Sequence, residues 1–341
     1  MADIKVSVII ACYNGEKTLE RMIDSFLRQS LNQCELILAD DCSSDTTRTI
    51  IGQYTSEYPE LIHAVYMEKN TKGSGVANAA FRIAKGEYVC WLDQDDWMEP
   101  QMLERLYEEA ISSDVLCDYV DCDICIRDGN GKEVENRASI LLPELGSISE
   151  DKRADLLVHP GYSITKIYRR QFLLDNNIWH FEYCSYDDNY FSELCAAHVS
   201  YAAKINDALY NKMARDGSTT RTLNSPLTFD RLKSALIMER ELRERGFYIT
   251  QRDACEFRFV ELYYVNSINA FLCGFYPPEL KTLKEIRTYV RKNYPDYRKN
   301  KYFRDNTNRR KRMLSLANDV SPTLLVAFYY LYRRVKAVLK K

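Results

Sequence analysis

The sequence predicts an α/β protein with a mostly parallel sheet, followed by a helical C-terminal region. In about the first 130 residues, apolar runs of strand length alternate with segments whose apolar residues recur at helical spacing. Such alternation is typical of a doubly wound sheet with helices on both faces. We therefore expect one domain over residues 1–220 and a helical region over residues 221–341, a division that suits a chain of 341 residues.

Each element of the alternating part has a local reason in the sequence. The runs "VSVIIACYN" and "CELILAD" are continuous and apolar, as buried strands are. Between them, Leu19, Met22, Ile23 and Phe26 recur at the spacing of one helix face. Pro100 suits the first turn of a later helix. The expected strands are residues 6–14, 34–40, 63–68, 87–93 and 118–126, and the expected helices are residues 19–27, 43–54, 75–86 and 100–110.

Polar side chains gather where the expected strands end, namely Tyr13, Asp41, Asp93, Asp95 and Asp96. In open parallel sheets, ligands bind at the carboxyl ends of the strands. Three neighbouring carboxylates repel one another, and a divalent cation such as Mg²⁺ or Mn²⁺ would relieve that repulsion. A nucleoside diphosphate would supply the remaining ligands. The alternative is a solvated turn that caps the next helix.

Several motifs in order resemble one known family. "VSVIIACYNGEKTLERMIDSFLRQS", "ELILADDCSSDTT" and "AKGEYVCWLDQDD" are similar in sequence and spacing to the family-2 glycosyltransferases, which have the GT-A fold. The resemblance continues through "KIYRR", "YDDNYF" and "LYNKMARDGSTT", so that it covers roughly residues 4–221. It implies a Rossmann-like GT-A domain that binds a nucleotide-sugar over residues 1–220.

The resemblance implies roles for the residues at the strand ends. Tyr13 would line the uracil pocket and Asp41 would hydrogen-bond the base. Asp93 would face the ribose and the donor sugar. Asp95 would be the main metal ligand of a D-x-D motif, and Asp96 would support the sugar or the metal shell. The alternatives are an ordinary strand-end aromatic for Tyr13 and a helix N-terminal cap for Asp41.

The chain departs from the family pattern at two donor-side positions. Ala11 replaces the small hydroxyl residue that often precedes the tyrosine by two, and Asn78 stands at the arginine position of a "GxxxARN" segment. Lys72, just before that segment, is expected to approach the diphosphate. The segment "RDGST" resembles a loop that closes over the donor, so that Arg215 is also expected on the donor side.

A second pair of acids bears on mechanism. Transfer of a sugar to a hydroxyl with inversion needs a carboxylate that takes the acceptor's proton. The resemblance assigns this role to Asp188, the second acid of "YDDNYF", whereas Asp187 and Asp188 could alternatively cap a helix start. Lys166 of "KIYRR" is expected to reach the acceptor or the phosphate, while Arg169 and Arg170 could be plain surface charges.

The C-terminal part is strongly basic. Residues 281–341 contain 18 Lys and Arg against 4 Asp and Glu, a balance of +14, although the whole chain has a net charge of −2. The apolar run over residues 324–332 is followed by basic residues, which fits a membrane-interface helix over residues 321–341 on an anionic leaflet. The alternative is a terminal helix that packs on the core or on a second subunit, which leaves a homo-oligomer open.

Other functional classes find little support. Neither a Walker A motif nor G-x-G-x-x-G is present, and "RRKRM" lacks a nucleic-acid recognition fold. Cys122 and Cys125 would point to opposite faces of a strand, so that we expect no metal site there. The first residues lack the apolar segment of a signal peptide, and eleven cysteines suit reduced thiols. We expect a cytoplasmic protein that lies peripherally on the inner face of the cell membrane.

Together these observations predict an inverting, divalent-metal-dependent glycosyltransferase. The expected donor is a UDP-sugar, and the expected acceptor is a hydroxyl of a glycan or lipid-linked glycan in cell-surface polysaccharide synthesis. Two alternatives remain open at this point. One is a nucleotidyltransferase that forms nucleotide-sugars, which would have a glycine- and arginine-rich loop where this chain has "ACYNGEK". The other is a catalytically silent binding module of a membrane assembly.

Overall fold

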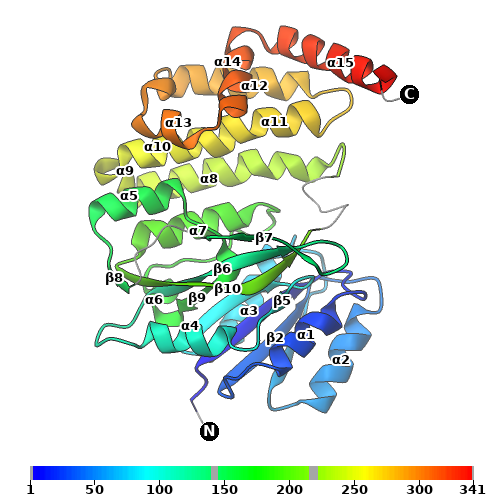
Figure 1. Cartoon of the computed structure of the whole chain (residues 1–341), viewed down its shortest axis with the longest axis vertical. Coiled ribbons are helices and arrows are strands. Elements are labelled where there is room, and N and C mark those ends of the chain that lie inside the picture. Colours follow the sequence, from blue (N-terminus) through cyan, green and yellow to red (C-terminus); the bar gives the residue numbers. More distant parts are fainter. Residues whose placement is uncertain (1–2, 140–144, 215–221, 340–341) are drawn as a thin grey trace. The chain divides into compact units, whose positions relative to one another are not determined.

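A computed structural model describes residues 3–139, 145–214 and 222–339 of the chain. The chain divides into two compact units, residues 1–215 and residues 216–341. The first unit contains one mixed sheet with helices packed on it, and the second unit is helical (Figure 1). The predicted α/β class with a helical C-terminal region is confirmed.

The sheet of the first unit has the order β3-β2-β1-β4-β9-β6-β10-β5. Its first four strands are parallel, β9 is antiparallel to β4 and β6, and β6 and β10 are parallel to each other. All five expected strands are present, with ends shifted by a few residues. The strands are β1 (Val6–Cys12), β2 (Cys34–Asp40), β3 (Ile62–Tyr66), β4 (Tyr88–Asp93), β5 (Trp97–Met98), β6 (Tyr119–Arg127), β7 (Glu133–Arg137), β8 (Leu145–Ser147), β9 (Lys166–Arg169) and β10 (Tyr201–Met213).

Helices cover both faces of the parallel strands. On one face, Val8 and Ile10 share a core with Met22 of α1. On the other face, Trp91 meets Phe81 of α3 and Phe191 of α7, with ring centroids 5.5 and 5.1 Å apart. Burial on two faces explains why the strands read as continuous apolar runs. The helices are α1 (Leu19–Leu27), α2 (Thr47–Glu57), α3 (Ser74–Ile83), α4 (Met102–Ala110), α5 (Glu150–Val158), α6 (Arg170–Asp175) and α7 (Asp187–His198).

β4 and β5 are neighbours in the chain but not in the sheet, where β5 is the last strand of the order. β5 follows β4 by only a few residues, yet it pairs with β10, where Met98 lies opposite Tyr210. The turn between β4 and β5 is therefore held by β1 through β4 and by β10 through β5. The register between β10 and β6 also shifts between Ile205 and Tyr210, which indicates a β-bulge in β10.

The second unit is built from helices around its own apolar core. Met238, Phe259, Ile268 and Ile286 are fully buried there. Within the described residues, none of the helices combines the length and the apolarity that crossing a membrane requires. The helices are α8 (Asp230–Glu244), α9 (Phe247–Thr250), α10 (Arg252–Val260), a π-helical turn (Glu261–Val265), α11 (Asn266–Cys273), α12 (Leu280–Asn293), α13 (Lys301–Asn306), α14 (Arg309–Val320) and α15 (Pro322–Leu339).

Gly86 lies at a close approach of two strands. Its backbone N–H donates to Ser7 Oγ at 2.8 Å, and a Cβ here would lie 2.5 Å from the backbone nitrogen of Ser7 and 2.6 Å from the carbonyl oxygen of Tyr88. Gly86→Ala should therefore lower the free energy of unfolding by about 2–3 kcal/mol, because backbone must move to admit the methyl group. Denaturant unfolding measures this change.

Gly52 provides the matched control. It lies within α2 and has no atom within 4 Å of an added Cβ. Gly52→Ala should keep or raise stability, by about 0.5–1 kcal/mol at most, because alanine favours the helix. Equal stability of the two variants would contradict the predicted close approach at Gly86.

Candidate active site

Several of the predicted donor-side residues share one face of the sheet at its carboxyl edge. Ala11 of β1 lies opposite Asp93 of β4 and opposite Ala39 of β2. Paired residues of neighbouring strands point to the same side, as do residues two apart. Asp93 therefore shares the side of Trp91, which faces α3 and α7, and Asp41 follows Ala39 by two residues.

Asp41 is buried and fixes the turn before α3. Its carboxylate accepts hydrogen bonds from the backbone N–H and the hydroxyl of Thr71 at 2.7 and 2.6 Å, and from the backbone N–H of Gly73 at 2.8 Å. Lys72 lies between them with a left-handed φ of 61°. Asp41 thus positions Lys72 at the start of α3, and its predicted contact with the base stays a prediction.

Tyr13 is exposed at this edge and its backbone is held by Gln94. The side-chain amide of Gln94 accepts from the Tyr13 N–H at 3.1 Å and donates to the Tyr13 carbonyl at 2.9 Å. The side chain of Tyr13 is 48% exposed, so that its ring is open to a ligand. A Cβ at Gly15 would lie 2.3 Å from Gln94 Oε1, so that a side chain there would have to displace the Gln94 amide from Tyr13. No motif in the sequence indicated this role of Gln94.

The acid turn, residues 93–96, brings three carboxylates together. One carboxylate oxygen each of Asp93, Asp95 and Asp96 lie within 4.8 Å of one another. Asp96 is only 1% exposed, and it accepts hydrogen bonds from Tyr210 Oη and the Met213 backbone N–H, both at 2.8 Å. Burial raises the pKa of Asp96 to about 7, although Lys212 opposes the rise.

The chemistry of this donor set fits a hard divalent cation. Mg²⁺ and Mn²⁺ prefer carboxylate oxygens and often keep open positions for phosphate oxygens. Asp93 and Asp95 are partly exposed, so that they remain accessible to an ion from solvent, whereas Asp96 is fixed from behind. The turn itself is held by Arg21, which donates to the backbone carbonyl of Asp95 and lies over the ring of Trp97.

Lys212 of β10 also reaches the acid turn, although no motif in the sequence indicated it. Its Nζ lies 2.9 Å from Asp93 Oδ2 and 3.6 Å from Asp96 Oδ2. The neighbouring carboxylates raise the pKa of Lys212 against the opposing effect of burial. Tyr210 and Lys212 are two residues apart on one strand, so that strand alternation within "LYNKMARDGSTT" was the available signal.

The start of α7 is anchored by His180. Its Nδ1 lies 2.6 Å from Asp187 Oδ2, and its ring stacks on Phe191 with centroids 4.4 Å apart. The side-chain amide of Asn78 exchanges two hydrogen bonds with the backbone of His180, at 2.9 and 3.0 Å. Asn78, at the expected arginine position, therefore ties α3 to this segment. Asp188, in the first turn of α7, is exposed and accepts from Asn189 Nδ2 at 3.1 Å.

Lys166 does not have the role expected for it. Its side chain is 3% exposed and forms an ion pair with buried Asp121, 3.2 Å away. Its ammonium also donates to the carbonyls of Pro160 and Tyr162. The expected contact with acceptor or phosphate is therefore wrong, because the ammonium group is used inside the fold. Arg169 pairs with Asp118 at 2.6 Å, and Arg215 lies outside the described residues.

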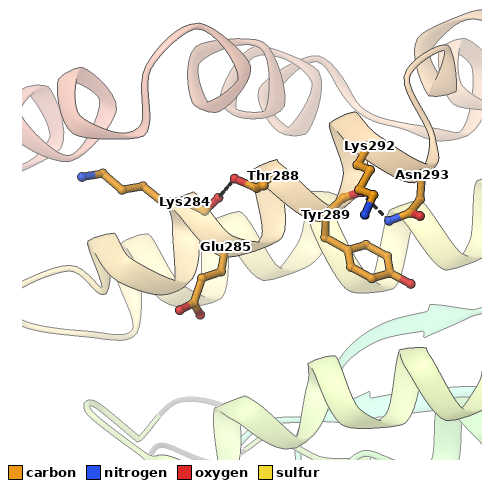
Figure 2. A pocket seen from close by; sticks show the side chains of 6 residues that line it. All are labelled: Lys284, Glu285, Thr288, Tyr289, Lys292 and Asn293. Carbon is orange, nitrogen blue, oxygen red and sulfur yellow. Dashed lines mark hydrogen bonds between the residues drawn. The ribbon is translucent and has the colours of Figure 1, made fainter.

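A separate hollow lies in the helical unit. Figure 2 shows the six side chains that line it, all from α12: Lys284, Glu285, Thr288, Tyr289, Lys292 and Asn293. It contains none of the residues predicted from the sequence, and its charged groups are exposed. The acid turn of the first unit is therefore the better candidate for chemistry.

Tyr210 tests whether the acid turn depends on β10. Tyr210→Phe should lower the free energy of unfolding by about 1–3 kcal/mol, because buried Asp96 loses a donor. It should also weaken Mn²⁺ binding to the protein, measured by the electron paramagnetic resonance of free Mn²⁺. Tyr107→Phe removes a hydroxyl that donates to Glu87 at 2.8 Å, at the start of β4, and should leave Mn²⁺ binding unchanged. Equal Mn²⁺ binding by both variants would contradict the dependence of the acid turn on β10.

Comparison with known proteins gives a consistent result. Residues 7–176 match the family model of glycosyl transferase family 2. TuaG of Bacillus subtilis, named for teichuronic acid biosynthesis, is 36% identical over 124 residues, 36% of this chain and 49% of that protein. The cholesterol galactosyltransferase of Borreliella burgdorferi is 28% identical over 274 residues, 76% of this chain and 74% of that protein. The chain spans about half the length of the first curated relatives that it matches.

A solved structure extends the likeness to nearly the whole chain. TarS of S. aureus, residues 1–349 in complex with UDP, has a TM-score of 0.67 at 20% identity, over 97% of this chain and 91% of that one. At this identity the likeness concerns the fold, which is the GT-A fold. With the family match over residues 7–176, these findings show that the chain belongs to glycosyl transferase family 2.

Proposed function

We propose that this chain transfers a sugar with inversion from a UDP-sugar to a hydroxyl group, with the help of a divalent cation. The observation that carries the proposal is the acid turn, where Asp93, Asp95 and Asp96 converge at the carboxyl edge of the parallel strands. Ligands bind at that edge in open α/β sheets. The UDP complex of the structurally similar TarS supports the choice of nucleotide.

On the donor side, the exposed ring of Tyr13 would stack on the uracil, and Asp41 would contact the base while it holds the turn of Lys72. The small side chain of Ala11 leaves room beside Asp93 for the ribose. Asp95 and Asp93 would hold Mn²⁺ or Mg²⁺, and Asp96 would keep the acid turn in position through its hydrogen bonds to β10. When bound, such a cation neutralises the charge that develops on the diphosphate leaving group.

On the acceptor side, Asp188 would take the proton of the attacking hydroxyl. It is exposed at the first turn of α7, where a carboxylate is favoured by the helix dipole. His180 and Asp187 would hold that turn in position, since their side chains are joined at 2.6 Å. The acceptor that we propose is a glycan or a lipid-linked glycan of cell-surface polysaccharide synthesis, in keeping with the name of TuaG.

Asp188→Asn tests the assignment of the base. The variant should bind UDP-sugar with unchanged affinity, but turnover should fall by at least about 10²-fold, because general-base catalysis is lost. The wild-type donor is identified first, by hydrolysis of a panel of nucleotide-sugars with Mn²⁺ and with chelator. Retained turnover would remove Asp188 from the role, and hydrolysis that is indifferent to chelator would contradict metal dependence.

We also propose that α15 docks the protein on an anionic membrane surface. Leu324, Phe328, Leu331 and Val335 are 68%, 71%, 61% and 50% exposed. At about 3.6 residues per turn, these four positions form one stripe along the helix. Another side of α15 packs on the unit, where Pro322 and Leu325 are buried.

Charge favours a lipid surface over a second copy of the chain as the partner. Arg334 flanks the stripe, and residues 281–341 carry a balance of +14, so that two copies would repel each other along this surface. Anionic headgroups complement the charge, and an apolar stripe beside basic residues is typical of helices that lie in a membrane interface. We therefore propose that the protein lies on the inner face of the cell membrane.

Vesicle flotation tests this surface. The full chain should float with vesicles containing about one third phosphatidylglycerol but not with phosphatidylcholine alone, and a triple Leu324→Ser, Phe328→Ser, Leu331→Ser variant should lose at least about tenfold in binding. Ile249→Ser, at a position that is 87% exposed on α9, is the control and should float normally. The proposal would be contradicted if the wild-type protein did not float. It would also be contradicted if the wild-type protein were a dimer and the triple variant a monomer.

A further inference from the structure

Lys212 differs from Lys166 and Lys204, the two buried lysines among the described residues of the first unit. Lys166 and Lys204 each pair with a single acid, Asp121 and Asp123, at 3.2 and 2.7 Å. Lys212 instead lies near two carboxylates, 2.9 Å from Asp93 and 3.6 Å from Asp96. Its side chain is 38% exposed, so that the ammonium group can leave this position for solvent or for a ligand.

The carboxylates that Lys212 neutralises are those that a divalent cation would use. Asp93 and Asp96 both belong to the cluster of three acids whose oxygens lie within 4.8 Å. An ammonium group and a divalent cation that share these oxygens would be a few ångströms apart, and their repulsion at that distance is large in a partly buried site. Binding of the cation therefore requires the ammonium group to move away from Asp93.

The displaced ammonium group has a short range of possible positions. Lys212 is rooted in β10, and Tyr210, two residues before it, is bonded to Asp96. A lysine carries its charge on a flexible four-carbon stem. Diphosphate oxygens that complete the coordination of a cation at the acid turn would lie within reach of that stem, and they carry the opposite charge.

We propose that Lys212 is a resident cation of the acid turn. Before metal and donor bind, its ammonium group neutralises Asp93 and Asp96 and keeps these carboxylates close together. When the metal binds, the ammonium group moves onto the donor diphosphate and helps to neutralise the leaving group. This inference rests on the proposed function, because it needs both the metal and the diphosphate.

Lys212→Met separates the two roles because it keeps the length of the side chain and removes its charge. Mn²⁺ binding to the variant alone, measured by the electron paramagnetic resonance of free Mn²⁺, should be at least about fivefold tighter because a competing cation is gone. UDP binding at saturating Mn²⁺, measured by calorimetry, should be at least about fivefold weaker because a diphosphate contact is lost. A residue that only supports the fold would lower both affinities.

Two further variants serve as controls. Lys204→Met removes a lysine from the same strand and should change neither affinity. Lys212→Arg keeps the charge and should bind UDP within about twofold of the wild-type protein. If Lys212→Met bound Mn²⁺ as the wild-type protein does, or more weakly, the role of Lys212 would be overturned. The proposal of a metal site at the acid turn would stand. Wild-type protein that binds no Mn²⁺, with or without UDP, would overturn both the proposed function and this inference.

Discussion

The site depends on one buried carboxylate. Asp96 is almost fully enclosed, and such a group is stable only where donors meet its oxygens. Tyr210 and the Met213 backbone provide them, and the hydroxyl of Tyr210 also accepts from the Asp93 backbone N–H at 3.2 Å. The position of the whole acid turn is therefore set by a strand that lies more than 100 residues later in the chain.

Two helices connect the site to the rest of the first unit. α3 begins at the turn that Asp41 holds, and Asn78 within it bonds the backbone of His180. His180 in turn meets Asp187 at the start of α7. The donor-side turn and the start of α7 are thus joined through Asn78 and His180, and the ring of His180 also packs against Trp91.

The sequence predicted the parallel strands and the acid turn because both are local. Apolar runs and the polar residues at their ends can be read without knowledge of the partners. The role of Lys212 could not be read in this way, because its contact with Asp93 spans 119 residues. Lys166 shows the opposite error: its place in a family motif suggested a ligand contact, but only the burial of Asp121 reveals that its charge is used internally. Sequence patterns identify which acids gather, whereas the opposing charges come from pairing between distant strands.

The bulge in β10 divides the strand into two halves whose side chains alternate between the faces of the sheet in opposite phase. Ile205 pairs with Cys122 and Tyr210 with Ile124, so that β10 has three more residues than β6 between these pairs. Because three is odd, inward and outward positions are exchanged along β10. Without these three extra residues, the alternation established by the first half would turn Tyr210 and Lys212 away from the acids. The two register shifts thus let one strand place Ala203 and Ile205 in the apolar core and then bring Tyr210 and Lys212 to the acids.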